Sequence, residues 1–118
     1  MKRFLAICIG TASALEKARW NELEEEKRKA LQASGIKAWM EWGTVNSAAI
    51  VDQGSPLGKT KRANPEGIAD IRNCMTGYVI VQAESHEAAA RMFENHPHFT
   101  IFPGDSVEIM ECLPLPVQ

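Results

Sequence analysis

The chain has 118 residues, of which 45% are hydrophobic and 24% are charged, and this fits one domain with a hydrophobic core rather than a disordered chain. Thirteen basic and fifteen acidic residues give a net charge of −2, which argues against a dedicated nucleic-acid binder because phosphate binding needs a positive surplus. No apolar run approaches the roughly 20 residues of a membrane span, so we expect neither nucleic acid nor a membrane as a partner.

The first predicted element is a strand over 4–9, which is apolar on both alternating faces. A strand with one wet face would alternate, so we expect both of its faces to be covered. The basic start Met1–Arg3, the apolar run and the small residues 12–14 also imitate a short secretory signal. We favour the strand, because the run is short for a signal and ends at Gly10.

A long helix is predicted next, over 15–33. Ser13 and Glu16 fit a capping box at its start, and Gly35 fits a C-cap at its end. Its acidic and basic residues are spaced for i,i+4 pairs, which is typical of a solvated helix face.

The middle of the chain is predicted to hold short elements and turns. These are a helical stretch over 36–42 ended by Gly43, a strand over 48–52, a turn over 54–58, a polar strand over 59–63 and a turn over 64–67.

The second half is predicted to run strand, helix, strand. Residues 78–83 form the clearest strand, again mostly apolar on both faces. Ser85 is expected to cap a helix that ends before Pro97. Residues 106–113 form the last strand, and an extended tail with two prolines follows.

This order predicts an α+β, ferredoxin-like split βαβ fold, with an antiparallel sheet and both helices on one of its faces. The other face would then be a large apolar patch, which monomers rarely tolerate. We therefore expect a homodimer whose two sheets pack face to face, as in a dimeric α+β barrel.

The three cysteines are Cys8, Cys74 and Cys112. The count is odd, the spacings are long and no CxxC pair occurs, so neither a zinc knuckle nor a thioredoxin-type site is indicated. A reducing cytoplasm is the expected location.

An ordered set of short motifs resembles the YCII-related proteins. The matching segments are Trp39-x-x-Trp42, 50–58 (IVDQGSPLG), 76–81 (TGYVIV), 83–85 (AES), Glu87-Ala88, Pro97-His98 and 104–109 (GDSVEI). They cover most of the chain from residue 36 on, together with the opening strand.

The resemblance implies one domain over residues 1–118 that dimerises as an α+β barrel. It also implies kinship with proteins thought to be small-molecule enzymes, in which a histidine and an aspartate share a pocket. Asp52 matches the aspartate, and His98 matches the histidine after the proline. The chain departs from the better-known branch in having no histidine among its first 85 residues.

Three residues are candidates for catalysis. An imidazole titrates near physiological pH in general, so His98 could move protons if it lies in a pocket, or it could make a structural hydrogen bond to a helix end. Asp52 could orient His98 or act as a base, or it could cap its own turn. Glu108, among apolar neighbours, could be an acid or base, or could pair with Lys59 or Arg62 across the sheet.

Four residues are candidates for ligand binding. Trp39 and Trp42 lie three apart on a helix and could wall a pocket for a planar ligand, or they could pack in the core. Tyr78 begins the clearest strand and is grouped with them. Lys59 could hold an anionic group, although charge on an edge strand also prevents aggregation.

Metal and cofactor sites are not indicated. His96 and His98, with His86 and Asp105 nearby, could supply ligands, but the pattern lacks a second ligand cluster. Residues 54–60 have three residues between their glycines, where a phosphate-binding loop needs four.

Two functional hypotheses follow from the sequence. The first is a small-molecule enzyme that uses His98 for acid–base chemistry on a small aromatic or carbonyl compound. The second is a non-catalytic ligand-binding or accessory module. An oxygen-using monooxygenase is suggested by analogy with other α+β barrels alone.

Overall fold

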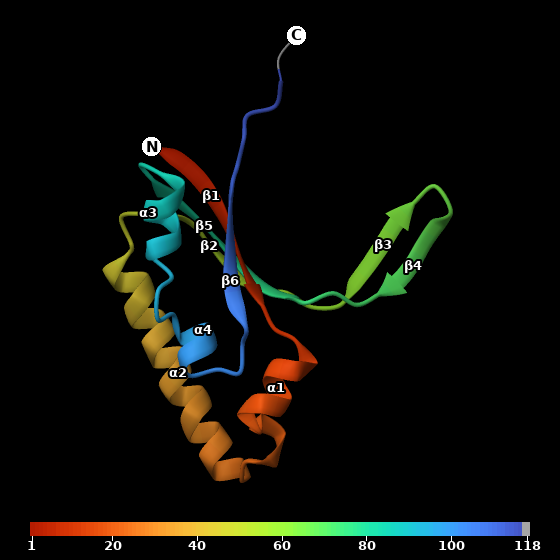
Figure 1. The fold of residues 1–118 in the computed structure, drawn as a ribbon, viewed down its shortest axis with the longest axis vertical. Coiled ribbons are helices and arrows are strands. Elements are labelled where there is room, and N and C mark those ends of the chain that lie inside the picture. Colours follow the sequence, from red (N-terminus) through yellow and green to blue (C-terminus); the bar gives the residue numbers. More distant parts are fainter. Residues whose placement is uncertain (117–118) are drawn as a thin grey trace.

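A computed structural model of the chain describes residues 1–116 (Figure 1). Its elements are β1 (Lys2–Ile9), α1 (Ala12–Ala18), the 3-10 helix η1 (Trp20–Glu22), α2 (Glu25–Val45), β2 (Ile50–Pro56), β3 (Thr60–Asn64), β4 (Gly67–Ile71), β5 (Met75–Ala83), α3 (His86–Arg91), α4 (Pro97–Thr100) and β6 (Ser106–Glu111). Four strands form an antiparallel sheet in the order β2-β5-β1-β6, and β3 and β4 form a separate two-stranded sheet. The predicted α+β, ferredoxin-like fold is confirmed.

The helices α2, α3 and α4 lie on one side of the four-stranded sheet (Figure 1). Side chains alternate along each strand, so every second residue of β1 and β5 points toward these helices and is buried. The core between the two layers comprises Phe4, Ala6, Val79, Val81, Ala83, Ala89 and Phe93.

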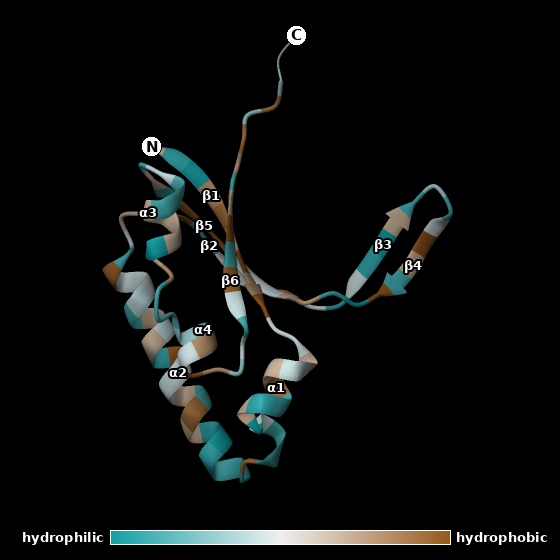
Figure 2. Ribbon diagram, in the orientation of Figure 1, coloured by the Kyte–Doolittle hydropathy of each residue, from teal (hydrophilic) through white to brown (hydrophobic). Residues whose placement is uncertain are grey.

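The opposite side of the sheet, called here the open face, has no helix over it (Figure 1). Its centre is formed by Leu5, Ile7, Tyr78 and Ile80, which are half-buried, and Leu5 lies opposite Ile80 while Ile7 lies opposite Tyr78. Figure 2 shows that the central strands are hydrophobic over much of their length. The apolar character of both faces, predicted from the sequence, therefore corresponds to one face covered by helices and one left open in this chain.

The predicted helix boundaries in the first half are wrong. Thr11, and not Ser13, caps α1, because its side chain accepts a hydrogen bond from the Ala14 N–H. The chain then leaves the helix at Arg19, which has a left-handed backbone conformation (φ 51°). The expected helices over 15–33 and 36–42 are replaced by α1 and a single long α2.

The two glycines expected to end helices lie inside α2. Gly35 is buried, and a side chain there would collide with the ring of Phe102. This glycine therefore serves close packing between α2 and a distant loop, which a helix-capping pattern cannot distinguish from a helix end. Gly43 has open space around its Cα and is tolerated within the helix.

The predicted turn over 54–58 is also wrong in part, because β2 continues to Pro56. The pairing of β2 with β5 shifts register between Ile50 and Asp52 and again between Asp52 and Ser55, so Gln53 and Gly54 fit into the strand as a bulge. Gly54 has φ 66°, and a side chain there would overlap the carbonyl oxygen of Tyr78, so only glycine fits.

The predicted polar strand is one half of a hairpin, whose other half, β4, the sequence analysis missed. The turn over 64–67 is confirmed, since Asn64 Oδ1 accepts the Glu66 N–H and Gly67 has φ 117°. We call residues 57–74 the arm. It projects away from the rest of the molecule (Figure 1).

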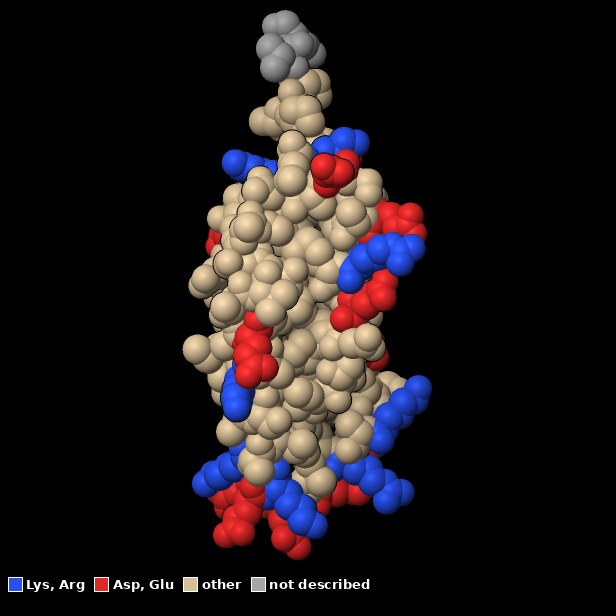
Figure 3. Space-filling view, turned by 90° about the vertical axis from the view of Figure 1, so that its left-hand side faces the viewer, with Lys and Arg blue, Asp and Glu red and all other residues tan. Residues whose placement is uncertain are grey.

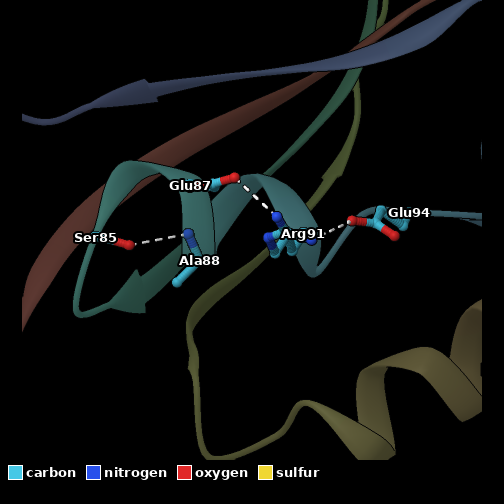
Figure 4. A network of polar contacts seen from close by, with 5 residues as sticks. All are labelled: Ser85, Glu87, Ala88, Arg91 and Glu94. Carbon is cyan, nitrogen blue, oxygen red and sulfur yellow. Dashed lines mark hydrogen bonds and ion pairs between the residues drawn. The ribbon is translucent and has the colours of Figure 1, made fainter.

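Helix α3 begins where it was expected to (Figure 4). The Ser85 hydroxyl oxygen accepts the Ala88 N–H at 3.0 Å, and Arg91 lies between Glu87 at 2.8 Å and Glu94 at 3.6 Å. The helix is shorter than expected. A separate short helix, α4, begins at Pro97, whose fixed φ suits the first turn.

The helical side of the molecule carries its charges unevenly (Figure 3). Lysines, arginines and acids gather at its lower end, where α1 and α2 meet, whereas much of its middle is uncharged. None of the helices described over residues 1–116 combines the length and apolar character needed to cross a membrane.

Candidate functional site

A cavity of about 860 Å³ lies between α2 and the β2 side of the sheet. Its walls come from α2, β2, the first half of β5, Cys8 of β1 and the segment around α4. The α2 side of the cavity is formed by Ile36, Trp39, Met40, Trp42, Gly43 and Thr44.

Trp39 and Trp42 form the aromatic wall of this cavity, and both are half-buried on α2. Trp42 Nε1 donates a hydrogen bond to the Met92 carbonyl oxygen at 2.8 Å, and its ring centroid lies 5.0 Å from that of Phe93. The indole is therefore anchored to the core while also facing the cavity. The two interpretations of the tryptophan pair, core packing and pocket wall, both apply.

His96 is the residue at this site that the sequence analysis undervalued, considering it only as a metal ligand. It is buried (1% exposed), and its ring centroid lies 4.5 Å from that of Trp39 and 4.9 Å from that of Trp42. Its Nδ1 accepts the His98 N–H at 3.1 Å, so it caps α4. A polar residue directly before a helix-starting proline was the available signal for this role.

Burial, and to a lesser extent the charge of His98, lowers the pKa of His96 to about 4. The ring is therefore neutral at pH 7. Since Nδ1 accepts a hydrogen bond, the proton of the neutral ring lies on Nε2. This assignment makes His96 a fixed support for α4 rather than a proton carrier.

His98 is buried and lines the cavity. Its Nε2 lies 2.7 Å from the carbonyl oxygen of Ile9, at the end of β1. A carbonyl oxygen only accepts, so Nε2 carries a proton, and in the neutral ring Nδ1 is the unprotonated nitrogen. Gly104 leaves room for the ring, because any side chain there would overlap its Cε1 and Nε2 atoms. The orientation of His98 is therefore fixed by β1 and by the segment that leads into β6.

Asp52 is not among the residues that line the cavity, although its neighbours Gln53 and Gly54 are. It is exposed, and its Oδ1 accepts the Gly54 N–H at 2.8 Å, which is the turn-capping arrangement that the sequence allowed. Within one chain the structure does not bring Asp52 to His98.

Glu108 lies on the far side of the molecule from the cavity. It is exposed on β6 and opposite Ile7, which places it on the open face, at the other edge of the sheet from β2. The sequence alternative of pairing with Lys59 or Arg62 across the sheet is not formed, because β3 belongs to the separate arm.

Lys59 is exposed at the base of the arm and does not line the cavity. Tyr78 borders the cavity, but it alternates with the buried Gly77 and Val79, so its side chain points to the open face and the cavity meets its backbone. Of the side chains singled out from the sequence, the cavity thus brings together His98, Trp39 and Trp42. It leaves out Asp52, Glu108 and Lys59.

The cavity also holds polar groups that the sequence analysis did not single out. These are Thr44, Ser47, Gln53, Ser55 and Thr76. Periodicity does not reveal them, because they come from a helix end and from an irregular strand. Cys8 lines the cavity too, but burial raises the pKa of its thiol to about 11, so it is not a thiolate at neutral pH.

The site is therefore an aromatic cavity with hydroxyl and amide groups and one buried histidine, His98. Among residues 1–116, no three histidine, cysteine or acidic side chains lie close enough together to hold a metal ion.

Comparison with known proteins finds similarity to a solved structure but not to a family model or a curated protein. A similar solved structure is the 5-chloro-2-hydroxyhydroquinone dehydrochlorinase TftG from Burkholderia phenoliruptrix AC1100, in complex with 2,5-dihydroxybenzoquinone. The TM-score is 0.53 and the identity 16%, over 92% of this chain and 90% of that chain. At this identity the likeness shows a shared fold.

Proposed function

We propose that this protein binds a small planar molecule in the cavity between α2 and the sheet, and that His98 performs acid–base chemistry on it. The observation that carries the proposal is the setting of His98, which is buried, lines the cavity and has its Nε2 held by the Ile9 carbonyl oxygen at 2.7 Å. A histidine oriented through one ring nitrogen keeps the other for proton transfer.

The ligand class follows from the cavity lining. Two indole rings favour a flat ring, and the surrounding side chains of Gln53, Ser55 and Thr44 can hydrogen-bond hydroxyl or carbonyl groups on it. The structural neighbour TftG is named for a substituted hydroquinone and holds a dihydroxybenzoquinone, and this supports a hydroxylated ring as the ligand here.

In the proposed chemistry, Nδ1 of His98 takes a proton from the bound ring compound and later returns it. The Ile9 carbonyl oxygen stabilises the imidazolium that forms, because it accepts the Nε2 proton throughout. His96 holds the backbone of His98 in place. No step passes through Asp52, Glu108 or Lys59, since none of them lines the cavity.

The test compares two histidines that both contact a backbone carbonyl. His98→Gln keeps a hydrogen-bond donor toward Ile9 and removes the titrating nitrogen. His86→Gln is the matched control, since His86 is exposed and lies 2.7 Å from the Ile109 carbonyl oxygen, outside the cavity. A panel of hydroquinones and quinones is followed by absorbance for turnover and by calorimetry for binding.

We expect His98→Gln to abolish turnover and His86→Gln to leave it unchanged. Turnover that survives His98→Gln would overturn the proposal. Binding without any turnover in the wild-type protein would instead identify the alternative function, a ligand-binding module.

The proposal includes a homodimer in which two open faces pack together. It is supported by the apolar centre of that face (Leu5, Ile7, Tyr78 and Ile80), which no part of the same chain covers over residues 1–116. Two sheets stacked in this way lie about 10 Å apart and bury each other's side chains. Sedimentation of the purified protein tests this directly, since a monomer at micromolar concentration contradicts it.

A cytoplasmic location is part of the same proposal. Its support is that Cys8, Cys74 and Cys112 are all free thiols, which a reducing compartment preserves.

A further inference from the structure

The arm, residues 57–74, is tied to the body at its base, where the Cys74 carbonyl oxygen accepts the Gly10 N–H and the Leu57 N–H donates to the Thr76 carbonyl oxygen. Its strands β3 and β4 pair with each other from Thr60 opposite Ile71 to Asn64 opposite Gly67, and neither packs extensively on another described element. Ile68 near its tip is 76% exposed. An isolated two-stranded hairpin is at best marginally stable in water, so this one needs a surface to lie on.

The direction of the arm identifies that surface. In Figure 1 the helices lie on one side of the sheet, and the arm bends away on the opposite side, past the open face. From Leu57 to Asn64 an extended chain spans about 23 Å at about 3.3 Å per residue, whereas two stacked sheets lie about 10 Å apart. A body seated on the open face would therefore lie alongside the arm.

We propose that the arm clasps a second copy of this chain that is seated on the open face, so that each protomer of the dimer is held by the partner's arm. This inference rests on the homodimer of the proposed function and adds to it a second contact region. In a twofold-symmetric pair the contact forms twice, because each protomer supplies one arm and receives one.

The distribution of charge favours a second copy as the occupant. The arm carries four basic and two acidic residues, a net charge of +2, so the remainder of a chain with net charge −2 carries −4. Lys61 is paired with Asp70 within the arm at 2.7 Å, whereas Arg62 and Arg72 have no ion pair among residues 1–116. The arm is thus complementary in charge to the body of the same protein.

The open face itself offers a place for these charges. Glu108, exposed on β6 opposite Ile7, lies on the open face at one edge of the sheet. An arm from the partner that passes over this edge would bring its arginines close to the Glu108 carboxylate, beside the apolar centre. The arm and the open face therefore form one continuous surface that matches a second copy of itself.

The experiment compares two exposed apolar residues on opposite sides of the molecule. Ile68→Asn lies on the arm, and Val45→Asn, at a residue 83% exposed at the end of α2, is the matched control on the helical side. Neither side chain belongs to the core, so both variants should fold, which circular dichroism checks. The dimer dissociation constant is measured by sedimentation, or the subunit exchange rate is measured where the dimer is too tight to dissociate.

We expect Ile68→Asn to raise the dissociation constant or the exchange rate about tenfold or more, and Val45→Asn to change it less than twofold. In a mixed dimer of isotope-labelled and unlabelled protomers, the Ile68 methyl groups should show intermolecular nuclear Overhauser effects. A wild-type protein that is monomeric overturns both this inference and the proposed homodimer. A stable dimer with equal values for both variants, or without intermolecular contacts to the arm, overturns the clasp alone.

Discussion

The two faces of the four-stranded sheet are built from alternate residues of the same strands, yet they differ in what covers them. On the helical side, Phe4 and Val81 are completely buried by helices of the same chain. On the open face, their immediate neighbours Leu5 and Ile80 remain half-buried. The centres of β1 and β5 are apolar on both faces, so there the difference lies in the covering layer and not in the strand sequence. An apolar run in a strand therefore does not tell which of its two faces the same chain covers.

The comparison is tested most strongly by truncating neighbouring residues on the two faces. Phe4→Ala removes a fully buried side chain and should lower the free energy of unfolding by about 3–5 kcal/mol at every protein concentration. Leu5→Ala should cost less in dilute solution, and its cost should grow with protein concentration, because in the proposed dimer its cover comes from a second chain. Urea unfolding at two protein concentrations measures both. A cost for Leu5→Ala that does not depend on concentration would contradict the open-face dimer.

The second test uses pH and concerns the helical side alone. The pKa of His96 is lowered to about 4 in the folded state, against 6.5 as its ordinary value, so the unfolded chain binds more protons between these values. The stability that neutral His96 contributes is complete above pH 6.5 and is lost as the pH falls toward 4, to a total of about 3 kcal/mol at about 1.4 kcal/mol per pKa unit.

The measurement is the difference in unfolding free energy between pH 7 and pH 4.5, for the wild-type protein and for His96→Asn. Asparagine can still cap α4, so this variant should fold and should lose most of that pH dependence. An unchanged pH dependence in the variant would assign the acid sensitivity to other groups.

The smallest expected effect lies outside both faces, at the exposed pairs of α3 (Figure 4). Arg91 is 66% exposed, and its pairs with Glu87 and Glu94 are screened by water and salt. Arg91→Ala should therefore change the free energy of unfolding by about 0.5 kcal/mol or less. Thermal unfolding at low and high salt checks this value, and a loss above 1 kcal/mol would show that Arg91 packs against the fold beyond its ion pairs.

The strands and the helical caps that depend on local pattern could be predicted from the sequence. The apolar runs gave the positions of β1, β5 and β6, and Ser85 marked the start of α3. The interruption at Arg19 was missed, because nothing in the local sequence marks an arginine for the left-handed conformation. Gly35 was misread, because its role depends on the ring of Phe102, which lies far along the chain.

The residues of the candidate site could be predicted only where a short sequence pattern, such as helical spacing or a proline, marks them. The tryptophan pair was identified by its helical spacing, and His98 by its place after Pro97. His96 was undervalued because its role depends on burial, and burial results from packing between α2 and the chain that follows α3. The location of Asp52 outside the cavity follows from irregular strand pairing, which no periodicity describes.

The irregular pairing of β2 has a consequence for solubility. β2 forms one edge of the sheet. Its pairing with β5 shifts register once before Asp52 and once after it. A bent strand with interrupted hydrogen bonding is a poor template for adding another strand. Strand addition along this edge is therefore disfavoured when chains meet there.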